Sequence, residues 1–80
     1  MPWYIYIIEC SDGKLYTGIS KNLKRRIEEH NSGNGCKFTR CRIPVKLRYQ
    51  GRVKSRSEAS KEEARIKALP RLKKIELLEK

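Results

Sequence analysis

The chain opens with a segment, Trp3 to Cys10, in which both alternating sets of positions are apolar. A half-exposed strand alternates apolar and polar residues, whereas a strand covered on both faces is apolar throughout. The two sets are Trp3, Ile5 and Ile7 on one face, and Tyr4, Tyr6 and Ile8 on the other. We therefore expect a central strand that is buried on both sides.

An Asp12-Gly13 turn follows, and the segment Leu15 to Ile19 predicts a returning strand. A two-residue loop, Asp12-Gly13, would place Tyr6 and Tyr16 on opposite faces of the hairpin. A three-residue loop that ends at Gly13 in the left-handed conformation would bring both tyrosines to one face. The sequence leaves both registers open.

A helix is predicted from a capping residue, Ser20 or Asn22, to about Asn31, and Gly33 is placed to end it. At about 100° per residue, the apolar positions 23 and 27 form one stripe of this helix. Arg26 and His30 lie on the flank of that stripe, whereas the basic residues at 24 and 25 point away from it. Arg26 is therefore the basic residue directed at the boundary between helix and sheet.

The segment 31–44 is polar, glycine-containing and rich in cations, which indicates a loop. An alternating segment, Val45 to Lys54, predicts a third strand with one apolar and one basic face, and Gly51 marks a candidate bulge. Ser57 is expected to cap a helix that runs to about Leu69. Pro70 would end that helix and open a second one. The last helix is expected to bury Leu72, Ile75 and Leu78.

The predicted order of elements is strand, strand, helix, strand, helix, helix. This order predicts an α+β fold in which a small antiparallel three-stranded sheet is flanked by helices. Eighty residues without an internal repeat or linker fit a single domain over residues 1–80.

Charge is the strongest global signal, because twenty Lys and Arg residues face nine Asp and Glu residues, a formal net charge of +11. Such a field attracts polyanions, of which nucleic acid is the commonest in cells. No apolar run approaches the roughly 20 residues that span a bilayer, and no signal-peptide pattern follows the N-terminus. We expect a nucleic-acid partner, no membrane and no obligate protein partner.

The cysteines, at positions 10, 36 and 41, are odd in number and lack the spacing of a zinc site. Reduced thiols in a cytoplasmic protein are the simplest interpretation, although a disulfide between Cys36 and Cys41 is conceivable.

Two neighbouring carboxylates, Glu62 and Glu63, lie in or beside the apolar stripe of the second predicted helix. A partly desolvated carboxylate needs a cation or a donor to compensate it. In the simpler alternative, the helix turns both glutamates to water, where they pair with Arg65 or Lys67. The helical wheel does not choose between the two glutamates.

Tyr6 and Tyr16 would ordinarily be core aromatics, and a single arginine or histidine carries little information. Together, however, two tyrosines, Arg26, His30 and a carboxylate supply proton acceptors, a phosphate-binding group and a hard metal ligand. The segments "YIY" at 4–6 and "YTG" at 16–18, followed by Arg26, His30 and a downstream glutamate, resemble a GIY-YIG nuclease domain. The resemblance covers nearly the whole chain and is nearest to small stand-alone bacterial members.

Carried over residue by residue, the resemblance implies the catalytic residues Tyr6, Tyr16, Arg26, His30 and Glu63, with Glu63 rather than Glu62 as the metal ligand. It implies Mg²⁺ (or Mn²⁺) as the cofactor and a phosphodiester as the substrate. A free tyrosine has a pKa near ~10, so a tyrosine base would need nearby cations. Which of the tyrosines or His30 is the base stays open.

The chain departs from the family pattern at Tyr4 and Thr17, where the motif name has Gly and Ile. Many members of the family also carry a further polar residue, often Asn, after the helix with the glutamate, and this chain has no Asn after Asn34. Gly18 closes the second motif, where a missing side chain would let substrate or a helix approach the strand.

The resemblance therefore implies a metal-dependent nuclease of DNA, or less favourably RNA, with little sequence specificity. We expect it to recognise structure, ends or single strands rather than a defined base sequence. Basic residues of the loop and third strand would hold the nucleic-acid backbone through salt-sensitive contacts. These residues are Lys37, Arg40, Arg42, Lys46, Arg48, Arg52 and Lys54. The main alternative is a non-catalytic basic nucleic-acid-binding protein of the same fold, which the missing Asn favours. A protein-interaction adaptor is a third class, for which so basic a surface offers little.

Overall fold

The computed structural model describes residues 2–35 and 37–78. A three-stranded antiparallel sheet of β1 (Trp3–Glu9), β2 (Leu15–Ser20) and β3 (Lys46–Val53) has the order β2-β1-β3. The helices are α1 (Leu23–Asn31), α2 (Lys37–Arg40), α3 (Arg56–Lys67) and α4 (Arg71–Leu78). The predicted fold class and element order are confirmed, and the short helix α2 is added within the predicted loop.

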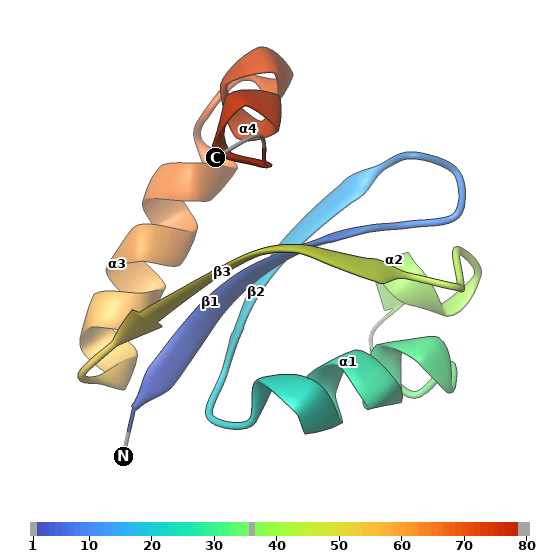
Figure 1. The fold of residues 1–80 in the computed structure, drawn as a ribbon, viewed down its shortest axis with the longest axis horizontal. Coiled ribbons are helices and arrows are strands. Elements are labelled where there is room, and N and C mark those ends of the chain that lie inside the picture. Colours follow the sequence, from blue (N-terminus) through green and yellow to red (C-terminus); the bar gives the residue numbers. More distant parts are fainter. Residues whose placement is uncertain (1, 36, 79–80) are drawn as a thin grey trace.

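Helices cover both faces of the sheet, with α1 on one side and α3 and α4 on the other (Figure 1). Beneath α1, the β1 side chains of Tyr6 and Ile8 pack with Leu23 and Ile27. On the other face, Ile5 and Ile7 pack with Ala59 and Ile66 of α3. The prediction of a central strand buried on both faces is therefore confirmed.

The hairpin has the register that brings the two tyrosines together. Ile8 pairs with Tyr16 across β1 and β2, and the turn closes with a hydrogen bond from Gly13 N–H to the Cys10 carbonyl at 2.9 Å. Gly13 has φ = +85°, which a glycine adopts without the steric cost of a side chain. Of the two loops that the sequence allowed, the three-residue loop is present, and Tyr6 and Tyr16 share one face.

The third strand differs from its prediction because of a bulge. Ile7 pairs with Tyr49 and Ile8 pairs with Leu47, so Arg48 is the extra residue, whereas Gly51 pairs regularly with Ile5. A bulge shifts the alternation of side chains by one position. Val45 therefore packs on the α1 face and Tyr49 on the α3 face. The predictions of a single apolar face and of a bulge at Gly51 were therefore wrong.

The helix ends are set mainly by short polar side chains. Asn22 caps α1 by accepting a hydrogen bond from Arg25 N–H at 3.1 Å. The cap of α3 is Ser55 rather than the predicted Ser57, because Ser55 accepts from Glu58 N–H while the Glu58 carboxylate accepts from Lys54 N–H. This is a variant of the capping box, in which serine and glutamate lie three residues apart.

The last helix packs through its C-terminal end. Leu77 and Leu78 contact the core on the α3 face, and Ile75 is half-buried. Leu72 is 75% exposed, so the prediction that it is buried was wrong. Within residues 2–35 and 37–78, no helix combines the length and apolarity that crossing a membrane requires.

Candidate functional site

The ring of Tyr6 lies over Gly18, its direct partner across β1 and β2. A Cβ atom at position 18 would lie 2.4 Å from the Tyr6 hydroxyl oxygen and 2.6 Å from Cζ. The missing side chain therefore makes room for Tyr6 itself, rather than for the substrate or helix that the sequence suggested. Tyr6 is thereby directed across β2 toward α1.

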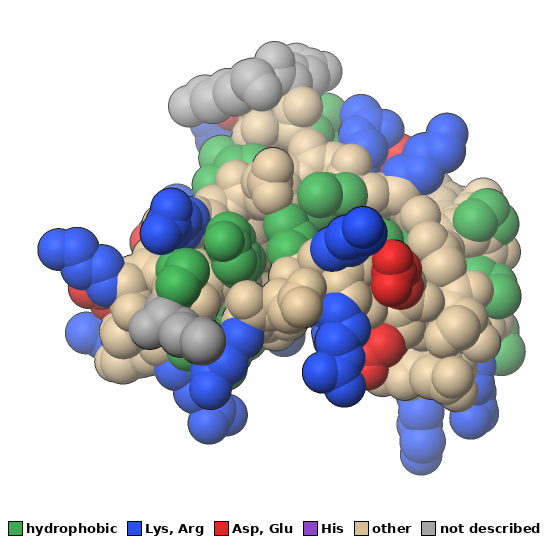
Figure 2. Space-filling view, turned by 60° about the horizontal axis from the view of Figure 1, so that its bottom comes forward, with side chains coloured by type: hydrophobic (Ala, Val, Ile, Leu, Met, Phe, Trp, Pro, Cys, Tyr) green, Lys and Arg blue, Asp and Glu red, His purple; other side chains and the backbone are tan. Residues whose placement is uncertain are grey.

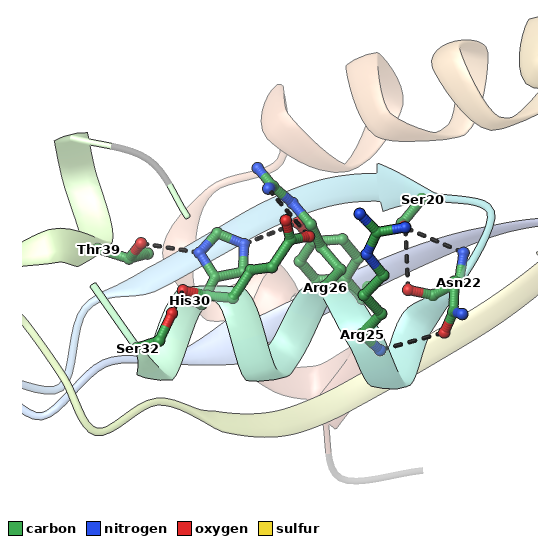
Figure 3. A network of polar contacts seen from close by, with 9 residues as sticks. Ser20, Asn22, Arg25, Arg26, His30, Ser32 and Thr39 are labelled. Atoms are coloured by element: carbon green, nitrogen blue, oxygen red, sulfur yellow. Dashed lines mark hydrogen bonds and ion pairs between the residues drawn. The ribbon is translucent and has the colours of Figure 1, made fainter. Parts of the chain in front are cut away.

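A buried chain of polar groups continues from this hydroxyl (Figure 3). The Tyr6 hydroxyl lies 3.0 Å from His30 Nε2, and His30 Nδ1 lies 2.8 Å from Thr39 Oγ1 on α2. Tyr6 is 1% exposed, and His30 and Thr39 are fully buried. Both ring nitrogens of His30 are thus held, which fixes the orientation of the imidazole.

His30 is kept neutral by its surroundings. Burial lowers the pKa of His30 below its ordinary value, the positive charge of Arg26 lowers it further, and Glu29 opposes both effects. A neutral imidazole donates through one nitrogen and accepts through the other. Because Arg26 hydrogen-bonds to the Tyr6 hydroxyl oxygen, we assign the tyrosine proton to His30 Nε2 and the His30 Nδ1 proton to Thr39.

Arg26 occupies the position predicted from the helical wheel. Its side chain is 27% exposed and lies 3.8 Å from a carboxylate oxygen of Glu29. Burial acts to lower the pKa of Arg26, but the hydrogen bond to Tyr6 and the nearby Glu29 and Tyr16 raise it by more. Arg26 is therefore a firmly charged guanidinium that joins the buried chain and also reaches the surface.

Tyr16 completes this group of residues. Its ring centroid lies 5.5 Å from that of His30, in an edge-on arrangement, and the corresponding distance for Tyr6 is 5.9 Å. Tyr16 is partly exposed, in contrast to Tyr6. The structure therefore brings together Tyr6, Tyr16, Arg26 and His30, of which Tyr16 and Arg26 are accessible from outside.

Glu63 lies on the other face of the sheet, on α3. Ala59 and Ile66 mark the buried side of this helix, and Glu62 and Glu63 lie on its two opposite flanks at about 100° per residue. Glu62 pairs with Arg65 at 2.8 Å, and Glu63 pairs with Lys67 at 3.7 Å.

Glu63 is a partly exposed carboxylate with a cationic neighbour. Its side chain is 26% exposed, and its charged neighbour is Lys67 Nζ at 3.7 Å. Residues 2–35 and 37–78 contain no group of three or more His, Cys, Asp or Glu residues that could hold a metal ion. A single accessible carboxylate fits Mg²⁺, which keeps several waters and binds substrate phosphates, better than it fits a fully protein-ligated metal.

The basic residues predicted to bind nucleic acid are dispersed, and Lys and Arg side chains project from several separate places on the face shown in Figure 2. Arg42 bonds to Asp12 at 2.9 Å, and Arg48 bonds to Glu9. Lys37 is on α2, as is Arg40, so both lie near the Thr39 contact with His30. Lys46, Arg52 and Lys54 lie on β3 or directly after it, at the edge of the sheet opposite β2.

Two residues that support His30, Thr39 and Gly35, were not predicted from the sequence. Thr39 is the partner of His30, and a Cβ atom at Gly35 would lie 2.3 Å from His30 Nδ1, so this glycine lets the loop close over the imidazole. A four-residue helix within a polar loop gives no periodic signal that could have indicated Thr39. Of the cysteines, Cys10 is buried and Cys41 exposed, and Cys36 lies outside the described residues.

Comparison with known proteins places this arrangement in context. The family model of the GIY-YIG catalytic domain matches residues 2–76. UPF0213 protein SSP2268 of Staphylococcus saprophyticus is 49% identical over 75 residues, which cover 94% of this chain and 92% of that protein. UPF0213 protein SAG0778 of Streptococcus agalactiae is 48% identical, with 94% and 85% covered. These names state no activity.

Two solved structures are also similar over 99% of this chain and 84% of theirs. The solution NMR structure of UPF0213 protein BH0048 from Bacillus halodurans has a TM-score of 0.64 and 43% sequence identity. That of EF2693 from E. faecalis has a TM-score of 0.66 and 40% identity.

Proposed function

This chain belongs to the GIY-YIG catalytic domain family, and from that premise we propose that it is a divalent-metal-dependent nuclease. It hydrolyses phosphodiester bonds of nucleic acid, DNA in preference to RNA, with little sequence specificity. The observation that carries the proposal is the network in which Arg26 and Tyr16 reach the surface while the buried chain from Tyr6 to Thr39 supports them.

Arg26 binds the phosphate at the bond to be cleaved. A guanidinium offers a fixed fork of donors that matches two phosphate oxygens at once. The raised pKa of Arg26 keeps it charged, since the tyrosine hydroxyls and Glu29 outweigh the effect of its partial burial. The hydrogen bond to Tyr6 sets its position on the flank of α1.

Tyr16 orients the attacking water and accepts its proton. It is the tyrosine with access to solvent, and the charge of Arg26 favours the phenolate form. Tyr6 and His30 are buried and act as positioning residues. Tyr6 holds Arg26, His30 holds Tyr6, and Thr39 holds the imidazole ring.

Glu63 would hold Mg²⁺ or Mn²⁺. When bound, the ion supplies positive charge that stabilises the transition state of the phosphate group. Lys67, which pairs with Glu63 at 3.7 Å, would have to move away from the carboxylate. Basic residues on α2 and β3 hold more distant parts of the nucleic-acid backbone through contacts that weaken with salt.

A non-catalytic nucleic-acid-binding protein is the second candidate, because the chain has no Asn after Asn34. The test is to incubate the purified protein with labelled single-stranded, duplex and branched DNA and RNA, each with Mg²⁺, Mn²⁺ or EDTA. Metal-dependent cutting supports the nuclease and identifies its substrate class. Salt-sensitive binding without cutting in any metal identifies the binding protein.

A further inference from the structure

A groove of about 610 Å³ opens between α1 and the strands β1 and β3. It lies along the flank of α1 opposite to Arg26, since Lys24 and Glu28 line it together with Leu47 of β3. Its volume falls in the range of small-molecule pockets, about 300–1,000 Å³. The active-site network described above does not use this groove.

The chemistry of the groove is amphipathic. Its apolar lining comes from Tyr4, Leu23, Ile27 and Leu47, and Leu47 is 38% exposed. Tyr4 and Gln50 also line it, and the structure shows no hydrogen bond from the side chain of either to another residue of the described ranges. These polar groups are therefore available to a ligand.

The rim of the groove is predominantly cationic. Two lysines, Lys21 and Lys24, and one acidic residue, Glu28, line the groove. The whole chain carries a formal charge of +11. An anionic ligand with a flat apolar body and polar edges is complementary to such a site. A nucleotide has this combination of properties.

We propose that the groove binds an unpaired nucleotide of the nucleic-acid substrate, an inference that rests on the proposed function. The base packs on Tyr4 and Leu47, as bases stack on aromatic side chains in proteins that bind single strands. The amide of Gln50 bonds to the edge of the base, for which amides have matching donors and acceptors. Lys21 and Lys24 contact the phosphates.

The strand β1 connects the groove to the candidate active site. Tyr4 and Tyr6 lie on one face of β1, about 7 Å apart along the strand. Gln50 is the direct partner of Tyr6 across β1 and β3. A base in the groove and a phosphate bound by Arg26 therefore lie on opposite flanks of α1. Duplex bases are paired and cannot enter the groove, so the substrate carries an unpaired nucleotide.

The molecule contains a reporter of groove occupancy. Lys21 Nζ lies 5.5 Å from the ring centroid of Trp3, the one tryptophan of the chain. A ligand phosphate that draws Lys21 away from the indole changes the fluorescence of Trp3. This signal requires no catalysis.

The test compares an eight-residue thymidine strand with an eight-residue abasic strand that has the same phosphates, both in EDTA to prevent cleavage. We expect the abasic strand to bind the wild-type protein at least about fivefold more weakly and to change the fluorescence of Trp3 only at correspondingly higher concentrations. Gln50→Ala is expected to weaken thymidine binding about fivefold without affecting the abasic strand. Lys24→Ala is expected to weaken binding more than Lys73→Ala, which removes the same charge from α4.

Equal affinity of the wild-type protein for the two strands would overturn the proposal, as would an equal effect of Gln50→Ala on both. The proposal would also be overturned if an acidic peptide bound in the groove, thymidine strands did not displace it, and those strands did not change the fluorescence of Trp3. Because these measurements exclude metal, the groove can fail while metal-dependent cutting persists. Conversely, base-dependent binding without any cutting would contradict the proposed nuclease activity but support the proposed nucleotide-binding groove.

Discussion

The ring of Tyr6 occupies the space that any side chain at position 18 would fill, because Tyr6 and Gly18 pair directly across β1 and β2. This packing directs the Tyr6 hydroxyl to His30 Nε2 at 3.0 Å and to Arg26. The glycine of the second motif is thus a structural requirement of the tyrosine of the first. A short sequence pattern in two strands thereby positions groups on α1.

Gly18→Ala is predicted to displace the Tyr6 ring, because the new Cβ would lie 2.4 Å from the hydroxyl oxygen. We expect a loss of about 1–3 kcal/mol in the free energy of unfolding and a fall in cleavage of at least about tenfold. Thermal unfolding and cleavage assays measure the two effects. The matched control is Gly51→Ala, whose Cβ would lie 3.6 Å from its nearest neighbour, the Tyr49 hydroxyl oxygen. Equal behaviour of the two variants would contradict the role given to Gly18.

The two tyrosine hydroxyls are predicted to differ in role. Tyr16→Phe should reduce the cleavage rate about 100-fold or more, as expected for loss of a proton acceptor, with little change in stability. Tyr6→Phe should reduce the free energy of unfolding by about 1–3 kcal/mol, because it leaves the buried His30 Nε2 without its partner. Single-turnover rates and urea unfolding separate these outcomes. If Tyr6→Phe abolished cleavage at unchanged stability while Tyr16→Phe stayed active, the two roles would be reversed.

Arg26→Lys is predicted to keep the charge and lose the two-pronged contact with phosphate. Cleavage should fall about tenfold or more, whereas binding of nucleic acid should change little. Arg25→Lys is the control, because Arg25 is exposed and points away from the sheet. Cleavage rates with saturating substrate make the comparison. Full activity of Arg26→Lys would indicate that a single positive charge is sufficient there.

His30 is predicted to make folding sensitive to mild acid. Its pKa is lowered from 6.5 in the folded protein by burial and by Arg26, against the opposing effect of Glu29, so the unfolded chain binds a proton more readily. The contribution of the neutral, buried His30 to the free energy of unfolding is therefore fully present above about pH 6.5. It is lost as the pH falls toward the lowered pKa of the folded state. Tyr6 and Tyr16 face the imidazole from the sheet and Thr39 from α2, and none of these is charged near neutral pH.

Urea unfolding between pH 7.5 and pH 5.5 measures this dependence. The wild-type protein should lose stability over this range, and His30→Gln should be less stable at pH 7.5 but lose less on acidification. Parallel curves for the two proteins would show that another group causes the dependence.

Much of the arrangement around Tyr6 could be predicted from local sequence. Gly13 permits the turn that puts both tyrosines on one face, and the helical period directs Arg26 to the sheet. These features depend on the period of a strand or helix and on the chemistry of one turn. Such signals are contained in a few consecutive residues.

The remaining features depend on contacts between distant segments. The bulge at Arg48 arises from how β3 pairs with Ile7 and Ile8, and strand periodicity alone does not indicate it. Thr39 reaches His30 because α2 packs on the end of α1, which no local pattern predicts. The choice of Ser55 over Ser57 was available from its spacing to Glu58, a signal that the prediction overlooked.

The most direct test of the nuclease is a comparison of Glu63→Gln with Glu62→Gln under Mg²⁺ and Mn²⁺. Both substitutions remove one carboxylate charge from α3, and both carboxylates are paired, Glu62 with Arg65 at 2.8 Å and Glu63 with Lys67 at 3.7 Å. We predict that Glu63→Gln abolishes metal-dependent cutting without loss of nucleic-acid binding, and that Glu62→Gln cuts like the wild-type protein. Equal cutting by the two variants, or no cutting by the wild-type protein in either metal, would contradict the account.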